Sequence, residues 1–448
     1  MNDTQSDMMA LVRELWPICR SICGPGLRET IRVIGAKLPL HITEIPTGTP
    51  VFDWAVPNEW ALRRATLTDS AGRIIIDTDV CNLHVVNYSI PYQGRLSLNE
   101  LRPHLYTLPQ RPTAIPYRTN YYSPKWGMCL SHESMQAMPD GDYDVNIDTA
   151  HQPGSLTIGE CVIPGELSRE VMLTCHTCHP MLANDNLASI AVLVELAKWL
   201  RESSRRFTYR IVFQPGTIGS IAWLATHKEL IPHIEHVLVC GCLGDKGVLN
   251  YKRTRHGDET LDKVVSSVLS SRGGKMRAFV PYGYDERQYS SPGVDLPAGL
   301  LSRTPNGEYA AYHTSDDNLS FLGPVAMADS LDALKQIVLE IERLGPQPRA
   351  VVHASLRDDC YINTAPYGEP QLGRRGVYQG LGSASKLPAT DFAVLWILNY
   401  SDGRHSLDEI IVRSGIDAFV MHTAHAALMS CGLLRKAEDG EVITPLSR

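Results

Sequence analysis

Residues 167–344 alternate between compact apolar runs and segments with helical periodicity, and this alternation restricts the fold more than any other feature. Three segments have the composition of buried strands, namely 170–175, 209–213 and 236–240. Between the first two, apolar residues recur at helical spacing over 190–200. Strands that alternate with helices predict an α/β fold with a largely parallel sheet and helices on both faces. In such sheets ligands bind beyond the carboxyl ends of the strands.

The segments before and after this region differ from it in composition and in the spacing of apolar residues, and this difference predicts further domains. Residues 41–165 contain short β-favouring runs separated by Pro and Gly. Near the C-terminus, helix-period stretches accompany a capping box of Ser406 with Glu409 and a turn at Asp439 and Gly440. Three helices with a hairpin predict a winged helix. We therefore expect three domains. The α/β domain is formed by residues 1–40 together with 166–384, the inserted β-rich domain by residues 41–165, and the winged-helix domain by residues 385–448.

The charge balance argues against a nucleic-acid partner. The chain has 42 basic and 49 acidic residues, a formal charge of −7, whereas phosphate neutralisation needs a basic excess on at least one face. The expected recognition helix of the winged helix, 418–426, contains no Lys or Arg that could reach phosphates or base edges. We therefore expect this domain to contact protein or to pack against the rest of the chain.

Three features predict a cytoplasmic protein with reduced thiols. The eleven cysteines are odd in number and residues 1–11 are polar. No apolar run approaches the roughly 20 residues needed to cross a bilayer, so no membrane partner is expected. The oligomeric state is left open, with a homo-oligomer as one option.

Two histidines and an aspartate lie within ten residues of one another after the first strand of the series. His176 and His179 flank a short loop, and Asp185 opens the next helix. Neutral imidazole nitrogens and carboxylate oxygens are the usual zinc ligands in open, reactive sites. The cluster therefore predicts a metal site at the carboxyl edge of the sheet. Two later polar clusters, 284–289 and 308–318, either belong to this site or form solvated loops.

Two alternatives use the cysteines of the same region. Cys175, Cys178, Cys240 and Cys242 supply four thiols, but the second pair lacks the usual zinc-knuckle spacing and neighbours on a strand face opposite sides. Cys178 could instead act as a nucleophile with His179 as its base, although the sequence identifies no third member of such a site.

At these residues the chain resembles the zinc-dependent aminopeptidase superfamily, in which a strand ends in His, an Asn-Asp pair opens a helix and a Tyr-His-Thr segment follows. It is more closely similar to an aminopeptidase-like family of unknown function, often found near polysaccharide or natural-product genes, with an inserted β domain and a C-terminal winged helix. The matching motifs span nearly the whole chain, at 15–22, 125–130, 285–289 and 369–376.

The resemblance implies a site with one or two zinc ions. By motif, His176 and His313 are the histidine ligands and Asp185 is the bridging carboxylate. His179 has no direct counterpart in the simpler aminopeptidases, and we expect it to contact the substrate, with a ligand or supporting role as alternatives. Zinc lowers the pKa of bound water toward about 7 and polarises the carbonyl under attack, while a carboxylate moves the proton.

Charge type and motif position suggest roles for five further residues. Asp285 and Glu286 are expected to receive the substrate ammonium or the shuttled proton. Arg287 or Arg303 would bind a substrate carboxylate, and Tyr312 would stabilise an oxyanion.

Two acidic positions of the full two-zinc site are missing or displaced. Relatives usually carry a Glu where this chain has Gly216, and the segment after the third strand offers no Asp before Asp245. Removal of a general base costs about 10²–10⁴ in rate. The carboxylates considered as replacements are Asp285, Glu286, Glu308 and Asp245.

These observations lead to one expected function and two alternatives. We expect a zinc-dependent aminopeptidase-like hydrolase that cleaves an amide bond of a small peptide or aminoacylated small molecule in a biosynthetic pathway. The first alternative is a single-zinc acyl-transfer or cyclising enzyme, similar to glutaminyl cyclases. The second is a catalytically silent metal-binding, ligand-binding or assembly protein that lost its general base at Gly216.

Overall fold

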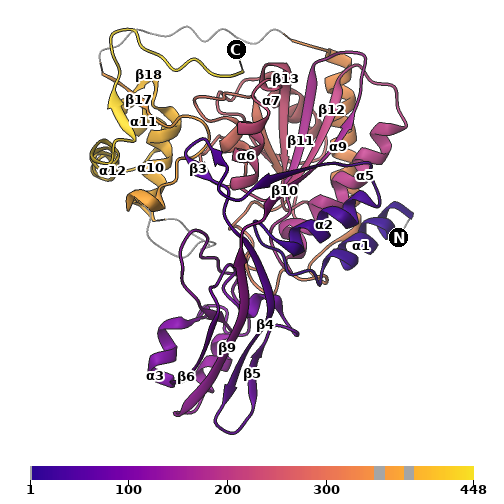
Figure 1. Cartoon of the computed structure of the whole chain (residues 1–448). Coiled ribbons are helices and arrows are strands. Elements are labelled where there is room, and N and C mark those ends of the chain that lie inside the picture. Colours follow the sequence, from indigo (N-terminus) through magenta and orange to yellow (C-terminus); the bar gives the residue numbers. More distant parts are fainter. Residues whose placement is uncertain (1–2, 348–358, 378–387, 448) are drawn as a thin grey trace.

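A computed structural model describes residues 3–347, 359–377 and 388–447 of the chain. Its centre is an eight-stranded mixed sheet in which the middle strands β12, β11, β13 and β16 run parallel and the flanking pairs β1/β10, β10/β12 and β14/β16 are antiparallel (Figure 1). The strands in spatial order are β1 (His41–Pro46), β10 (Ser155–Ile163), β12 (Thr208–Gln214), β11 (Glu170–His176), β13 (Ile234–Cys240), β16 (Ala298–Ser302), β14 (Asn250–Lys252) and β15 (Lys275–Arg277). The α/β class is confirmed.

The side chains of the central strands alternate between two hydrophobic cores. Leu173 and Cys175 of β11 join the core on one face, whereas Met172 joins the core on the other face. Because both faces are covered, these strands are apolar throughout rather than alternating. The first core is covered by α1 (Asp3–Leu15), α2 (Pro25–Gly35), α5 (Ser189–Arg201), α7 (Thr260–Ser270) and α9 (Pro324–Leu344), and the second by α6 (Ile218–Thr226) and α8 (Glu286–Tyr289).

A separate antiparallel sheet, in the order β5-β4-β9-β6, projects from the large sheet (Figure 1). Its strands are β4 (Glu59–Asp69), β5 (Ile74–Asp77), β6 (Tyr92–Ser97) and β9 (Asp142–Gln152). The expected insert, 41–165, also contains β1 and β10, and these strands pair within the large sheet instead. The separate sheet therefore contains fewer of the strands in 41–165 than the change in composition suggests. Strand-like composition does not reveal which sheet a strand joins.

The C-terminal unit is a winged helix with α10 (Ala389–Tyr400), α11 (Leu407–Ser414) and α12 (Ala418–Ser430). The capping box of Ser406 and Glu409 is present at the start of α11. The strands of this unit are β17 (Cys360–Asn363), β18 (Asp402–Ser406) and β19 (Leu434–Lys436), in the order β18-β17-β19. The unit therefore includes residues upstream of the expected boundary at 385.

The prediction of a β-hairpin at Asp439 and Gly440 is wrong for the described residues. β19 pairs with β17, and the chain after the turn returns to other partners. The N–H of Ile443 donates to Asp402 O (3.0 Å), and the N–H of Leu446 donates to Gly293 O of the α/β domain (2.8 Å). The backbone groups that a hairpin would use are thus satisfied elsewhere.

A buried ion pair between Arg255 and Asp402 connects the α/β domain to the winged helix, and Asp295 of the α/β domain pairs with the same arginine. The guanidinium of Arg255 contacts Asp402 of β18 at 2.7 Å and Asp295 at 3.2 Å. Within the described ranges, no helix combines the length and apolar character that crossing a bilayer requires.

Candidate metal centre

Three residues from two segments that are distant in sequence converge at the carboxyl end of β11. His176 ends β11, Asp185 lies in the short helical segment η3 (Ala183–Ala188), and His313 lies between β16 and α9. Nε2 of His176 is 3.0 Å from Oδ1 of Asp185, and Nε2 of His313 is 3.0 Å from Oδ2. All three side chains are buried. The two histidines therefore flank one carboxylate, and their coordinating roles stay a prediction.

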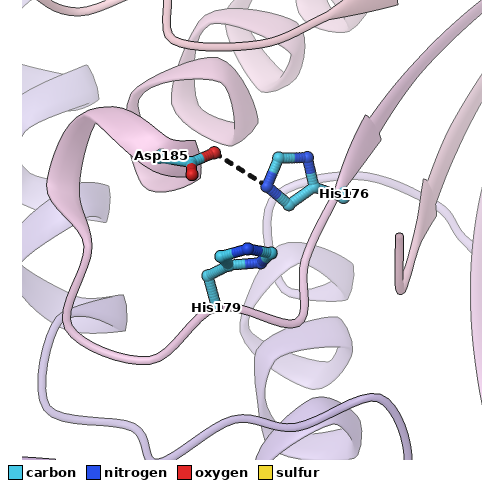
Figure 2. Close-up of side chains that lie close together, drawn as sticks. All are labelled: His176, His179 and Asp185. Carbon is cyan, nitrogen blue, oxygen red and sulfur yellow. Dashed lines mark ion pairs between the residues drawn. The ribbon is translucent and has the colours of Figure 1, made fainter. Parts of the chain in front are cut away.

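A third imidazole lies beside this carboxylate (Figure 2). His179 follows β11, and its ring centroid is 4.5 Å from that of His176 and 5.3 Å from that of His313. One ligand atom from each of His176, His179 and Asp185 can be chosen so that all lie within 4.8 Å of one another. We expected a substrate contact for His179, and its position suits a metal ligand equally well.

The contact between His176 and Asp185 fits a shared ion. Nε2 of His176 is buried and makes no hydrogen bond to a described residue, although Oδ1 of Asp185 is only 3.0 Å away. This separation also suits two ligands of one small cation. Imidazole nitrogen and carboxylate oxygen are also ligands that zinc takes in catalytic sites. The residues present therefore fit a divalent metal.

The charges within the cluster suit metal binding as well. Burial alone would raise the pKa of Asp185, but His179 and His176 hold that pKa well below its usual range. Burial lowers the pKa of His179 well below the usual value for an imidazole. Asp185 is therefore an anion and His179 is neutral near pH 7, and these are the forms that coordinate a metal.

Two residues to which the sequence analysis assigned no role hold η3 in place. The carboxylate of Asp317 accepts hydrogen bonds from the backbone N–H groups of Asn184 (2.6 Å) and Asp185 (3.1 Å). The side-chain amide of Asn186 donates to Cys240 O at the end of β13 (3.1 Å). These bonds join η3 to two segments that are distant in sequence.

Aromatic side chains pack against the cluster. The hydroxyl of Tyr284 donates to Oδ1 of Asp185 (2.9 Å), and its ring stacks on His176 with centroids 4.9 Å apart. The ring of Tyr312 stacks on His313 with centroids 3.9 Å apart. Tyr312 is therefore next to the site, and its expected oxyanion role stays a prediction.

The inserted domain contributes directly to the site through residues 111–117, which we call the strap. The strap runs along the loop of His313. The Ile115 N–H donates to the Ser315 hydroxyl (3.0 Å), and the Ser315 N–H donates to Ile115 O (2.9 Å). The Tyr117 N–H donates to His313 O (2.8 Å), and Arg111 pairs with Asp316. The backbone of His313 is thus fixed by the inserted domain.

Asp285 lies at the loop that contains Gly216. Its Oδ1 accepts hydrogen bonds from the Thr217 N–H (2.7 Å) and the Ser220 hydroxyl (3.1 Å). Burial raises the pKa of Asp285. A carboxylate from another segment therefore reaches the neighbourhood of the missing Glu.

The other candidate carboxylates are engaged with different partners. Glu286 is fully buried and pairs with Lys252. Glu308 is exposed and pairs with Arg277 at 2.5 Å. Asp245 accepts hydrogen bonds from the side chains of Asn184 (3.0 Å) and Thr304 (2.8 Å), and from the backbone N–H groups of Thr304 (3.1 Å) and Gly247 (2.7 Å).

The two arginines expected to bind a substrate carboxylate are paired with carboxylates of the chain. Arg287 pairs with Glu369. Arg303 pairs with Asp329 at 2.9 Å and also donates to Gly247 O and Ala326 O. None of these contacts brings either guanidinium to the histidine cluster.

The thiols do not form a common site. Cys175 and Cys240 belong to the core on one face of the sheet, Cys178 to the core on the other face, and Cys242 to a third cluster. Burial raises the pKa of the Cys178 thiol to about 12. Its Sγ lies 3.2 Å from Nδ1 of His179, the base named in the nucleophile alternative, but a thiol that stays protonated near pH 7 is a weak nucleophile.

Comparison with known proteins agrees with this architecture. A family described as a domain of unknown function, DUF4910, matches residues 9–343, and a winged helix-turn-helix family matches 359–436. A Clostridium acetobutylicum protein named for polysaccharide biosynthesis and an aminopeptidase-like domain is 41% identical over 436 residues, which cover 97% of each chain.

Solved structures give the same picture. The crystal structure of a protein from Clostridium acetobutylicum that is titled a peptidase has a TM-score of 0.75 and 40% identity, with 97% of each chain covered. A zinc aminopeptidase from Bacillus subtilis has a TM-score of 0.55 and 12% identity, over 75% of this chain and 94% of that one. The second likeness concerns the fold alone. The chain therefore belongs to the aminopeptidase-like DUF4910 family and carries a C-terminal winged helix.

Proposed function

We propose that this chain is a zinc-dependent hydrolase of amide bonds in a small peptide or aminoacylated small molecule. The observation that carries the proposal is the convergence of three imidazoles, from His176, His179 and His313, around the carboxylate of Asp185. The zinc aminopeptidase fold and the relative named for polysaccharide biosynthesis support the reaction class and the biosynthetic setting.

The donor set differs in charge from the one that the aminopeptidase resemblance implies. Gly216 and Cys242 stand in the segments where the resemblance leads us to expect a Glu and an Asp, and His179 supplies an uncharged donor in their place. The site therefore offers one anionic ligand, Asp185, and we expect it to hold a single zinc ion. A bound zinc ion supplies the Lewis acid that polarises the amide carbonyl and acidifies a water molecule.

We assign the proton transfer to Asp285. Its Oδ1 is 2.7 Å from the backbone nitrogen of Thr217, next to Gly216. Burial raises the pKa of this carboxyl group, and a carboxyl with a raised pKa exchanges a proton more readily with water and a leaving amine. Glu286 is less suited to this role, because Lys252 neutralises it inside the protein.

The first test is zinc content combined with hydrolysis of aminoacyl amides. We expect about one zinc per chain, and amide hydrolysis that the His176→Ala variant lacks. Asp285→Asn should keep the zinc and lower kcat by about 10²–10⁴. Ser220→Ala, which removes one hydrogen bond to Asp285 and keeps the carboxylate, is the matched control and should lose far less. Zinc binding without hydrolysis of any amide would favour the binding-protein alternative.

A second variant tests whether Gly216 marks a lost or a relocated base. A Cβ at position 216 would lie 3.6 Å from Cβ of His176 and 3.8 Å from Sγ of Cys178, which are ordinary contacts. Gly216→Glu is therefore sterically feasible at its first carbon. If Asp285 moves the proton, the added Glu should leave activity unchanged or lower it. A gain of activity in an otherwise inactive chain would contradict the role of Asp285.

A further inference from the structure

Four arginines of the described chain have buried side chains, and three of them face carboxylates. Guanidinium groups are rarely buried without a counter-charge, because leaving water costs much more than hydrogen bonds to neutral groups return. The paired arginines are Arg210 with Glu160 and Glu170, Arg255 with Asp295 and Asp402, and Arg303 with Asp329.

Arg20 is the exception within the described ranges. Its side chain is 0% exposed, and no described carboxylate forms an ion pair with it. Nε donates to His179 O (2.9 Å) and Nη1 donates to Leu15 O (2.6 Å). Nη2 is buried and has no hydrogen-bond partner among the described residues. The side chain therefore carries an unbalanced charge and one unused donor nitrogen.

Arg20 contacts the backbone of a candidate ligand of the metal centre. Its Nε holds the backbone of His179, whose ring lies 4.5 Å from that of His176. The ring of Tyr117, in the strap, is 5.0 Å from that of His179. The guanidinium of Arg20 thus lies beside His179, one of the candidate ligands. This site lacks the two carboxylates that the aminopeptidase resemblance led us to expect.

We propose that Arg20 receives a carboxylate of the molecule that binds at this centre, so that the site selects amides with an adjacent anionic group. The inference rests on the proposed function for the identity of the site. It transfers to Arg20 the role that sequence reasoning gave to Arg287 or Arg303, whose guanidiniums already face Glu369 and Asp329. The planar fork of an arginine suits a carboxylate, which can accept from two nitrogens.

The competing explanation is purely structural. Leu15 is the last residue of α1, and Arg20 ties its carbonyl and that of His179 together. A structural tie predicts a loss of stability on mutation but no selectivity for charged ligands. The two explanations therefore differ in a binding measurement that compares ligands of equal size.

The probes are N-acetylglycine and N-acetylglycinamide, which differ only in a carboxylate against a carboxamide. Calorimetric titration of the full chain, both zinc-loaded and chelator-treated, measures binding without requiring turnover. We expect the wild-type chain to bind N-acetylglycine at least about tenfold more tightly than the amide. Arg20→Met should reduce this preference to about twofold or less, and Arg20→Lys should retain part of it, because the charge remains but the fork is lost.

Arg95→Met in the inserted domain is the control, because Arg95 is an exposed arginine that pairs with Asp142 and Asp144. It should leave the preference unchanged. Equal binding of the two probes to the wild-type chain, no binding of either probe, or a preference that persists in Arg20→Met would each overturn the inference. If Arg20→Met does not fold, the wild-type preference and the Arg20→Lys variant decide. If the chain prefers the carboxylate probe but hydrolyses no amide, the role of Arg20 in binding a carboxylate is supported and the proposed hydrolase function is contradicted.

Discussion

The two histidines on either side of Asp185 are held by different parts of the molecule. His176 ends a central parallel strand, and η3 with Asp185 follows it nine residues later, so that this side of the site depends on the sheet itself. His313 lies in a loop whose backbone is bonded to the strap of the inserted domain. The inserted domain is therefore part of the site's architecture, and damage to each side should have different consequences.

The largest effect should come from Asp185, which both sides share. Asp185→Asn removes the anion between Nε2 of His176 and Nε2 of His313. We expect zinc affinity to fall by more than the approximately 100-fold that loss of a supporting residue can cost, with hydrolysis lost in parallel. Chelator competition and elemental analysis measure this. Asp148→Asn, which removes a surface carboxylate paired with Arg63, is the control, and equal zinc affinity in the two variants would contradict a ligand role for Asp185.

A smaller effect is expected when only the strap is weakened. The double variant Arg111→Ala, Ser315→Ala removes an ion pair and a hydrogen bond between the strap and the loop of His313. Because these groups orient a ligand without touching the ion, zinc affinity should fall by about tenfold. Arg63→Ala, which breaks an exposed ion pair elsewhere in the inserted domain, should leave it unchanged. Identical affinities would mean that the sheet alone positions the site.

A third effect, on stability rather than on zinc affinity, concerns Asp317, which connects the two sides by accepting hydrogen bonds from the backbone of η3. Burial raises its pKa from 3.8 to about 7. Because the folded chain keeps this proton to a higher pH than the unfolded chain, its contribution to stability is fully present below 3.8 and is lost as the pH rises through about 7. The free energy of unfolding of the wild type, relative to Asp317→Asn, should therefore decrease by up to about 1.4 kcal/mol per pH unit.

Urea unfolding of chelator-treated protein at pH 5 and pH 7 measures this difference. The Asn side chain cannot ionise but can still accept one hydrogen bond, so the comparison isolates the ionisation. A difference between wild type and variant that stays constant between the two pH values would show that Asp317 does not titrate in this range.

The sheet side of the site could be predicted from sequence, whereas the loop side could be predicted only in part. His176, His179 and Asp185 lie within ten residues after an apolar strand, so local pattern and strand direction bring them together. His313 was found by its motif, but the strap was not, because the bonds between Ile115 and Ser315 join segments 200 residues apart. Asp317 lies in the polar cluster 308–318 that the sequence singled out, but its role was not predicted, since its partners at Asn184 and Asp185 lie more than 130 residues away.

The remaining differences also arise from contacts between distant segments. β1 and β10 have strand-like sequences, but only their pairing places them in the large sheet rather than in the insert. The turn at Asp439 and Gly440 has hairpin composition, yet the following residues bond to Asp402 and Gly293. Composition indicates the type of element in both cases, and competition between partners decides its neighbours.

The most direct test is the location of zinc in crystals of the purified protein, by anomalous scattering at the zinc absorption edge. We predict one strong peak within coordination distance, about 2.0–2.2 Å, of Asp185 and of imidazole nitrogens from at least two of His176, His179 and His313. A zinc-supplemented crystal with no peak at this cluster, or with zinc bound only at the cysteines, would contradict the proposed metal centre.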